Sequence, residues 1–356
     1  MLRTSHAVNR RDFVRTAAAG LAAIPLVRLD RLYAPAAPIR SRVALVRTAD
    51  RKRGVAEAIA LLDPKGISGK RVVLKPNFNS ADETPASTHV DTLSQLISEL
   101  RERDARSVTL GESSGPPRTH DVMEAKGIFD LARDMRFDLV DFEQIGESDW
   151  VHFEPDGSRW PGGFYLPRLV VDSEYTVSTC CLKTHGYGGV FTMSLKLSVG
   201  LTPKRLRGTM HRSRDMRRMI AELNTGYRPS LIVLDGVTAF TDGGPSQGEL
   251  KQANVMIAGS DRVAVDAVGL AVLKQLGARH STYGVQEDHY GKFGTALIGT
   301  LEEGLGDKFT PELRSAWTEA YLLISSLMRR GAAKVSGAFP VLVLESERTA
   351  AETDAA

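Results

Sequence analysis

The chain has 356 residues and a formal net charge of +3, with 46 lysines and arginines against 43 aspartates and glutamates. The first 36 residues hold six of those basic residues and two of the acidic ones, which leaves 40 against 41 in the remainder. A remainder so close to neutral gives no support for nucleic-acid binding. No stretch reaches the roughly 18 apolar residues of a membrane-spanning helix, so we expect no transmembrane helix in the mature chain.

The first 36 residues have the pattern of an export signal rather than of a folded segment. The run Asn9-Arg10-Arg11-Asp12-Phe13 resembles a twin-arginine signal, and an apolar stretch at 17–27 follows it. This resemblance implies export of the folded protein by the twin-arginine translocation machinery, often with a cofactor already bound. We therefore expect a signal peptide at 1–36 and a periplasmic or otherwise exported protein. The leader is either cleaved near Ala34–Ala37 or retained as an anchor.

Most of the remaining chain alternates between β-prone segments and amphipathic helices. In the segment that follows residue 89, Leu93, Leu96 and Leu100 recur with the helical period. Strands are expected at 42–47, 71–75, 107–112, 137–142, 174–179, 230–236, 254–258 and 339–344. Helices are expected at 54–62, 90–103, 121–133, 203–224, 262–276 and beyond Leu313.

This alternation predicts a single layered α/β domain over residues 40–345, with a mostly parallel central sheet flanked by helices. Residues 150–167 are rich in glycine, proline and aromatic residues, which predicts a hairpin-like excursion from the layers. Residues 346–356 are an Ala/Glu/Asp-rich tail that we expect to be disordered.

Four expected strands end on a polar or ionisable residue that a loop follows. These residues are Lys75, Glu112, Lys183 and Asp235, and His185 comes just after the third of them. Ligands of parallel α/β sheets bind beyond the carboxyl ends of the strands, so we expect the five side chains to share one crevice. Lysines and a histidine beside carboxylates can bind an anion and move a proton, because mutual charge and burial shift their pKa values.

The loops beyond the strands supply further candidates for substrate binding. Asn77, Glu112 and Lys196 are polar groups near the predicted crevice, and Gly243 and Gly244 belong to a glycine-rich loop that would line it. That loop matches neither of the common nucleotide-binding glycine patterns. The loop therefore supports no claim of nucleotide binding.

A divalent transition metal is an alternative occupant of the same region. His89, His185 and His211, with Asp235 or Asp242, offer ligand types that suit Zn, Mn, Fe or Ni. No pair among them has the i, i+4 spacing of a helical metal motif, so the metal is predicted from residue types alone.

The only cysteines, Cys180 and Cys181, are adjacent. Two thiols cannot hold a four-cysteine cluster, which excludes an iron–sulfur centre of the chain's own. They are either small buried hydrophobic residues or soft metal ligands or redox thiols.

Lysines and arginines recur between Lys204 and Arg218 in an expected helical region. Such a stretch either grips phosphates or an acidic partner, or it is a solvated face.

Taken in order, several motifs resemble the domain of unknown function 362 family. They are Val73-Leu74-Lys75-Pro76-Asn77, Thr88-His89, Leu182-Lys183-Thr184-His185, Ser194-Leu195-Lys196, Asp235-Gly236, Gly243-Gly244-Pro245 and the run Asp261–Asp266. The resemblance covers roughly residues 40–300. It implies an α/β fold with a site built from these residues, and it names no substrate. Some members carry ferredoxin-like cysteine motifs, which this chain lacks.

These observations predict an exported enzyme that acts on a small anionic substrate such as a carboxylate. Lys75, Lys183, His185 and Asp235 are the predicted catalytic residues, with the lysines holding the anion and His185 acting as acid or base. One alternative is a periplasmic ligand- or cofactor-binding protein without turnover. Another is a scaffold that docks an acidic partner through residues 204–218.

Overall fold

The computed structural model describes residues 39–186 and 191–278, scattered positions between 295 and 318, and residues 346–348. The chain divides into two compact units, one made of Met1–Ile39 with Thr349–Ala356 and the other of Arg40–Arg348. The candidate site described below lies within the second unit. Among the described helices, none combines the length and apolar character that membrane crossing requires.

Several predictions fall wholly or largely outside the described residues. They are the twin-arginine leader at 1–36, the helix beyond Leu313 and the strand at 339–344. Within the expected tail at 346–356, β11 (Ser346–Arg348) pairs with β1 (Ile39–Ser41) in a two-stranded sheet, and the rest of the tail is not described.

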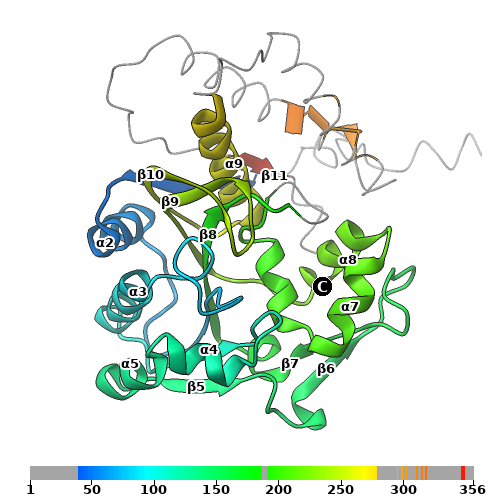
Figure 1. Ribbon diagram of the computed structural model, residues 1–356, viewed down its shortest axis with the longest axis horizontal. Helices are drawn as coiled ribbons and strands as arrows, with labels where there is room; N and C mark the ends of the chain where they lie inside the picture. Colours follow the sequence, from blue (N-terminus) through cyan, green and yellow to red (C-terminus); the bar gives the residue numbers. More distant parts are fainter. Residues whose placement is uncertain are drawn as a thin grey trace, which may run out of the picture. The chain divides into compact units, whose positions relative to one another are not determined.

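A seven-stranded sheet forms the centre of the second unit, in the order β2-β10-β9-β8-β3-β4-β5 (Figure 1). The neighbours from β9 to β5 pair in parallel, whereas β10 is antiparallel to both β9 and β2. This confirms the predicted α/β fold with a mostly parallel sheet. The strands are β2 (Val43–Arg47), β3 (Arg71–Lys75), β4 (Ser107–Glu112), β5 (Asp138–Asp141), β8 (Tyr175–Lys183), β9 (Leu231–Gly243) and β10 (Gly248–Gly259).

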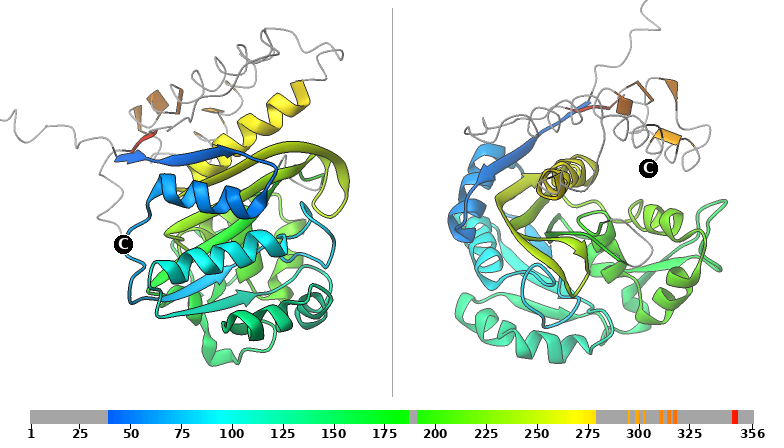
Figure 2. Two further views of the ribbon diagram at one scale, coloured as in Figure 1. Left: turned by 90° about the vertical axis from the view of Figure 1, so that its left-hand side faces the viewer. Right: turned by 45° about the horizontal axis from the view of Figure 1, so that its top comes forward.

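Helices cover both faces of the sheet, as Figure 2 shows. The apolar sides of the helices between β2 and β5 pack on one face, in a core that contains Leu74, Leu96 and Val177. On the other face, one core joins α9 to β8–β10 and another joins η4, α7 and α8 to β3. The helices are α2 (Arg51–Leu62), α3 (Val90–Glu102), α4 (Thr119–Ala125), α5 (Ile128–Met135), η3 (Glu147–Asp149), α6 (Arg168–Val171), η4 (Lys196–Leu201), α7 (Lys204–Arg212), α8 (Met216–Leu223) and α9 (Arg262–Ala278).

The expected excursion at 150–167 is an antiparallel hairpin of β6 (Trp150–Phe153) and β7 (Phe164–Pro167), which confirms that prediction. The rings of Phe153 and Phe164 stack across it with their centroids 5.3 Å apart. An aromatic pair of this kind adds to the stability of a short hairpin.

Two expected helices are each broken in two. The helix predicted at 121–133 is interrupted at Gly127, whose positive φ of 66° ends α4 and starts α5. The basic helix predicted at 203–224 is interrupted between Arg212 and Met216, where the backbone of Ser213 is extended. In both places the apolar period continues past the break, so periodicity alone predicts one helix.

Candidate functional site

A pocket of about 660 Å³ lies beyond the carboxyl ends of β3, β4 and β8. Its walls come from those strand ends, from η4 and α7, and from the tip of the β9–β10 hairpin. Both the volume and the position are usual for a small-molecule site in an α/β protein. Predicted site residues in its lining are Lys75, Asn77, Glu112, Lys183, His185, Lys196 and His211.

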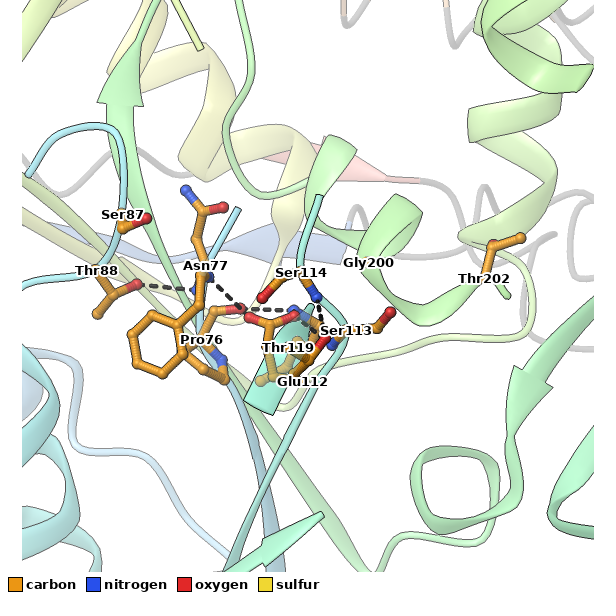
Figure 3. Close-up of polar contacts among 12 residues, drawn as sticks. Pro76, Asn77, Ser87, Thr88, Glu112, Ser113, Ser114, Thr119, Gly200 and Thr202 are labelled. Atoms are coloured by element: carbon orange, nitrogen blue, oxygen red, sulfur yellow. Dashed lines mark hydrogen bonds and ion pairs between the residues drawn. The ribbon is translucent and has the colours of Figure 1, made fainter. Parts of the chain in front are cut away.

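Lys75 and Glu112 form a buried ion pair between two neighbouring strand ends. Lys75 Nζ lies 2.5 Å from Glu112 Oε1, and each residue is 1% exposed. The same carboxylate accepts hydrogen bonds from the amides of Ser113 at 2.7 Å and Phe78 at 2.8 Å. Figure 3 shows Glu112 and Ser113 beside Pro76 and Asn77, which follow β3. Burial lowers the pKa of Lys75, and the charge of Glu112 opposes that shift. The lysine's charge is thus already balanced inside the protein.

Gly200 allows η4 to approach this pair closely. A Cβ atom at position 200 would lie 3.0 Å from Lys75 Nζ and 3.4 Å from Glu112 Oε1. Because glycine has no side chain, η4 can pack directly against the ion pair.

Lys183, at the end of β8, has a different environment. Its Nζ donates to the carbonyl oxygens of Ala86 at 2.5 Å and Pro245 at 3.3 Å. Among the described residues, no carboxylate lies within ion-pair distance of it, although it is 1% exposed. Burial lowers the pKa of Lys183. The side chain is anchored by neutral groups and its charge lacks a counter-ion within the described part of the chain.

His185 and Lys196 meet at the edge of the pocket, with Lys196 Nζ in contact with His185 Nε2. Burial, helped by the charge of Lys183, lowers the pKa of Lys196 to about 8. Two basic nitrogens in contact cannot both be protonated at low cost, so the pair shares one proton. This arrangement can take up and release a proton near neutral pH.

Arg207 is a site residue that the sequence reasoning placed only within a general basic stretch. It is 8% exposed and donates to the carbonyl oxygens of Thr202 at 2.8 Å and Ser114 at 2.5 Å and to Ser113 Oγ at 2.6 Å. These bonds clamp the loop after β4 to the turn after η4. Burial lowers the pKa of Arg207 to about 10.

One face of α7 points into the pocket, so the basic stretch 204–218 is not entirely a solvent-exposed surface. Lys204, Arg207 and His211 all line the pocket and are spaced by three and four residues, which places them on one side of a helix. That spacing is a signal the sequence does carry. Lys204 Nζ lies 2.8 Å from Glu143 Oε1 and so has its own carboxylate partner.

Asp235 does not join the pocket. The prediction treated it as a strand end, but β9 continues to Gly243, so Asp235 lies within the strand. Its carboxylate accepts from Arg51 Nε at 2.9 Å, from Thr92 Oγ1 at 2.6 Å and from the Val237 amide at 3.0 Å. These bonds tie β9 to α2 and α3, on the far side of the sheet from η4 and α7 (Figure 1).

The four predicted metal ligands are not gathered in one place. His185 and His211 line the pocket, whereas Asp235 bonds to α2 and α3, and His89 Nδ1 accepts the Asp91 amide at 3.0 Å as the cap of α3. Within the described ranges, no group of three or more His, Cys, Asp or Glu side chains is placed to share a metal ion. The metal stays a prediction.

Gly243 and Gly244 are not among the residues that line the pocket, but they position the hairpin tip, which does line it. Gly244 has a φ of 79°, and a Cβ there would lie 2.1 Å from the Thr184 carbonyl oxygen. This close approach seats the hairpin tip on the segment after β8, and the next residues, Pro245 and Ser246, reach the pocket wall.

Cys180 and Cys181 are both buried in β8, and burial raises the pKa of both thiols. A buried, protonated thiol is a poor nucleophile and metal ligand, which favours the interpretation as small hydrophobic residues. Cys180 packs in the core beneath α9.

Comparison with known proteins finds two matching family models. The model described as domain of unknown function (DUF362) matches residues 72–271, more than half of the chain. A globin model matches residues 251–328. The two overlap at 251–271, where the structure has the end of β10, within the central sheet, and the first part of α9.

A thylakoid-associated protein of Synechocystis, sll1697, is 24% identical over 260 residues, which are 69% of this chain and 78% of that protein. A flavohemoprotein of Bacillus subtilis is 35% identical over 75 residues, which are 20% of this chain and 18% of that protein. The lactate racemase apoprotein from Thermoanaerobacterium thermosaccharolyticum superposes with a TM-score of 0.44 and 15% identity, over 64% of this chain and 56% of that one.

Proposed function

The chain belongs to the DUF362 family of unknown function, and from that premise we propose that it is an enzyme acting on a small anionic molecule. His185 would move the proton in the reaction, and the lysines of the pocket would hold the anion. The proposal rests on one observation above the others. Among the described residues, the pocket lining contains five lysines and arginines but a single carboxylate, that of Glu112.

The hydrogen-bond and ion-pair partners of the basic side chains in the pocket support binding of an anion. Lys75 and Lys204 have carboxylate partners, whereas the contacts described for Lys183 and Arg207 are all to neutral oxygens. A buried cation without a counter-ion is costly. A carboxylate or a similar anion in the pocket would offset that cost, and Asn77 would add a polar contact at the rim.

The contact between His185 and Lys196 supports proton transfer. His185 would exchange a proton with the substrate, and Lys196, whose Nζ contacts His185 Nε2, would exchange protons with that imidazole. Lys183 would meanwhile keep the anion close to the imidazole, because Lys183 and His185 line the same pocket.

The variant His185→Gln separates an enzyme from a binding protein without turnover. Glutamine retains a polar group of similar reach but cannot act as a general base. We expect kcat to fall by about 100-fold or more while KM and anion affinity change little, since positioned acid–base groups contribute about that factor. Steady-state rates and calorimetric titration with the same anion measure the two effects. Equal losses of rate and affinity, or loss of affinity alone, would favour the binding protein.

A further inference from the structure

Four of the described lysines line the pocket, and three of them are held by oxygen acceptors. Lys75 Nζ binds the Glu112 carboxylate, Lys204 Nζ binds the Glu143 carboxylate, and Lys183 Nζ binds two carbonyl oxygens. An oxygen acceptor can only take hydrogen bonds from a lysine, so it favours the charged ammonium. These three side chains are therefore suited to remain charged and not to react as nucleophiles.

Lys196 is the exception among these four. The contact described for its Nζ is to a nitrogen, His185 Nε2. The residue is only partly buried, and it lines the same pocket as the other three lysines. An imidazole can accept a proton from an ammonium, which makes the free amine available as a nucleophile. The neighbouring charge of Lys183 acts in the same direction, because two ammonium groups close together repel.

The chain just before Lys196 is held in place by a buried carboxylate. Asp266, 3% exposed in α9, accepts from the Ser194 amide at 2.8 Å, from Ser194 Oγ at 2.5 Å and from the Leu195 amide at 3.0 Å. The two residues before Lys196 are thus fixed by a buried carboxylate. The amine therefore extends into the pocket from a fixed backbone segment, and a nucleophile requires such positioning.

We propose that Lys196 forms a Schiff base with the carbonyl carbon of a 2-oxo acid bound in the pocket, with His185 as the acid and base of that step. This inference rests on the anion site proposed above and gives it a substrate class. A 2-oxo acid has both features that the pocket matches: a carboxylate for the anchored cation Lys183, and an adjacent electrophilic carbon for the amine.

The atoms balance without an oxidant or a further reactant. Lys196 first gives one ammonium proton to His185, which leaves the free amine. The nitrogen lone pair then forms the C–N bond as the C=O π bond breaks, and the imidazolium gives its proton to the new alkoxide to form a hydroxyl group. His185 next takes a second proton from the nitrogen and donates it to that hydroxyl, the C–O bond breaks, and water leaves. The product is the protonated imine, and the carboxylate stays on Lys183 throughout.

Borohydride trapping on the full chain tests the proposal, with pyruvate as the probe. Reduction converts the imine to a stable secondary amine, and peptide mass spectrometry locates it. We expect one adduct per chain, on Lys196, and no adduct in Lys196→Arg, which keeps the positive charge. In His185→Gln we expect the adduct to form about 100-fold more slowly. Lys70, an exposed lysine on the surface, provides the matched control, and Lys70→Arg should leave trapping unchanged.

The possible outcomes separate this inference from the proposed function. If pyruvate binds by calorimetry but no adduct forms, or if Lys70 is modified as readily as Lys196, the Schiff base is overturned and the anion site stands. If acetone is trapped as fast as pyruvate, the 2-oxo acid class is overturned. If pyruvate and other small anions fail to bind at all, both proposals fall together.

Discussion

At the scale of single residues, two lysines of the pocket have the same exposure but different hydrogen-bond partners. Lys75 and Lys183 are each 1% exposed, yet the first has a carboxylate partner, whereas the partners of the second within the described ranges are carbonyl oxygens. The sequence predicts both positions from the strand ends. It cannot predict the difference, because Glu112 lies 37 residues from Lys75 and Ala86 lies 97 residues from Lys183, and only the folded sheet brings them into contact.

The buried pair predicts a large stability effect for Glu112→Gln. This change removes the carboxylate charge and leaves the ammonium of Lys75 buried without a counter-ion. We expect the free energy of unfolding to fall by about 3–5 kcal/mol, measured by urea denaturation. The exposed pair Arg133 and Asp130 is the control, and Asp130→Asn should cost less than about 1 kcal/mol. If the two variants lose similar stability, the buried pair does not have the role assigned to it.

At the scale of elements, two motifs far apart in the sequence are linked by one carboxylate. The first motif, Ser194-Leu195-Lys196, leads into η4, which begins at Lys196. Asp266 belongs to the second motif and lies in α9. The hydrogen bonds that Asp266 accepts from Ser194 and Leu195 connect the two motifs. The resemblance to the family includes both motifs but does not relate them. No local pattern does so either, because the contact spans 72 residues and depends on how α9 packs against the sheet.

This link predicts a specific pH dependence. Burial raises the pKa of Asp266 to about 6, against the opposing effect of the hydrogen bonds from Ser194 and Leu195. The unfolded chain binds that proton only below about pH 4, so Asp266 contributes most to stability at low pH and that contribution is lost as the pH rises through about 6. Asp266→Asn removes the titration.

We therefore expect the difference in free energy of unfolding, wild type minus Asp266→Asn, to shrink by up to about 3 kcal/mol between pH 4 and pH 7. Urea denaturation at several pH values measures it. The exposed Asp138 in β5 gives a control, since Asp138→Asn should show no such trend. A difference that grows with pH would contradict the account of Asp266.

The strand-end reasoning works where its premise holds. β3, β4 and β8 are parallel neighbours, and the residues that end them, Lys75, Glu112 and Lys183, meet in the pocket as predicted. For Asp235 the premise fails, because β9 and β10 continue as a long hairpin past residue 236, where the sequence predicts that the strand ends. The pairing partner that extends a strand is not visible in the strand's own sequence.

At the scale of the whole molecule, the alternation of strands and helices is enough to predict the layered α/β fold. It does not predict that β10 and β2 close one side of the sheet in antiparallel fashion. The globin match at 251–328 begins within β10, so in this chain its first residues serve the central sheet. Sequence likeness over so short a segment describes the segment and not the architecture around it.

Binding of a small anion in the pocket is the central claim, and calorimetric titration tests it most directly. The wild type, a double variant Lys183→Gln with Lys196→Gln, and the exposed control Lys70→Gln would each be titrated with pyruvate and phosphate after their folding is checked by circular dichroism. We predict binding to the wild type and to the control, and a loss of at least about 10-fold in the double variant, since hydrogen bonds to charged groups are each worth about 1.5–3 kcal/mol. Unchanged anion affinity in a folded double variant would contradict the account.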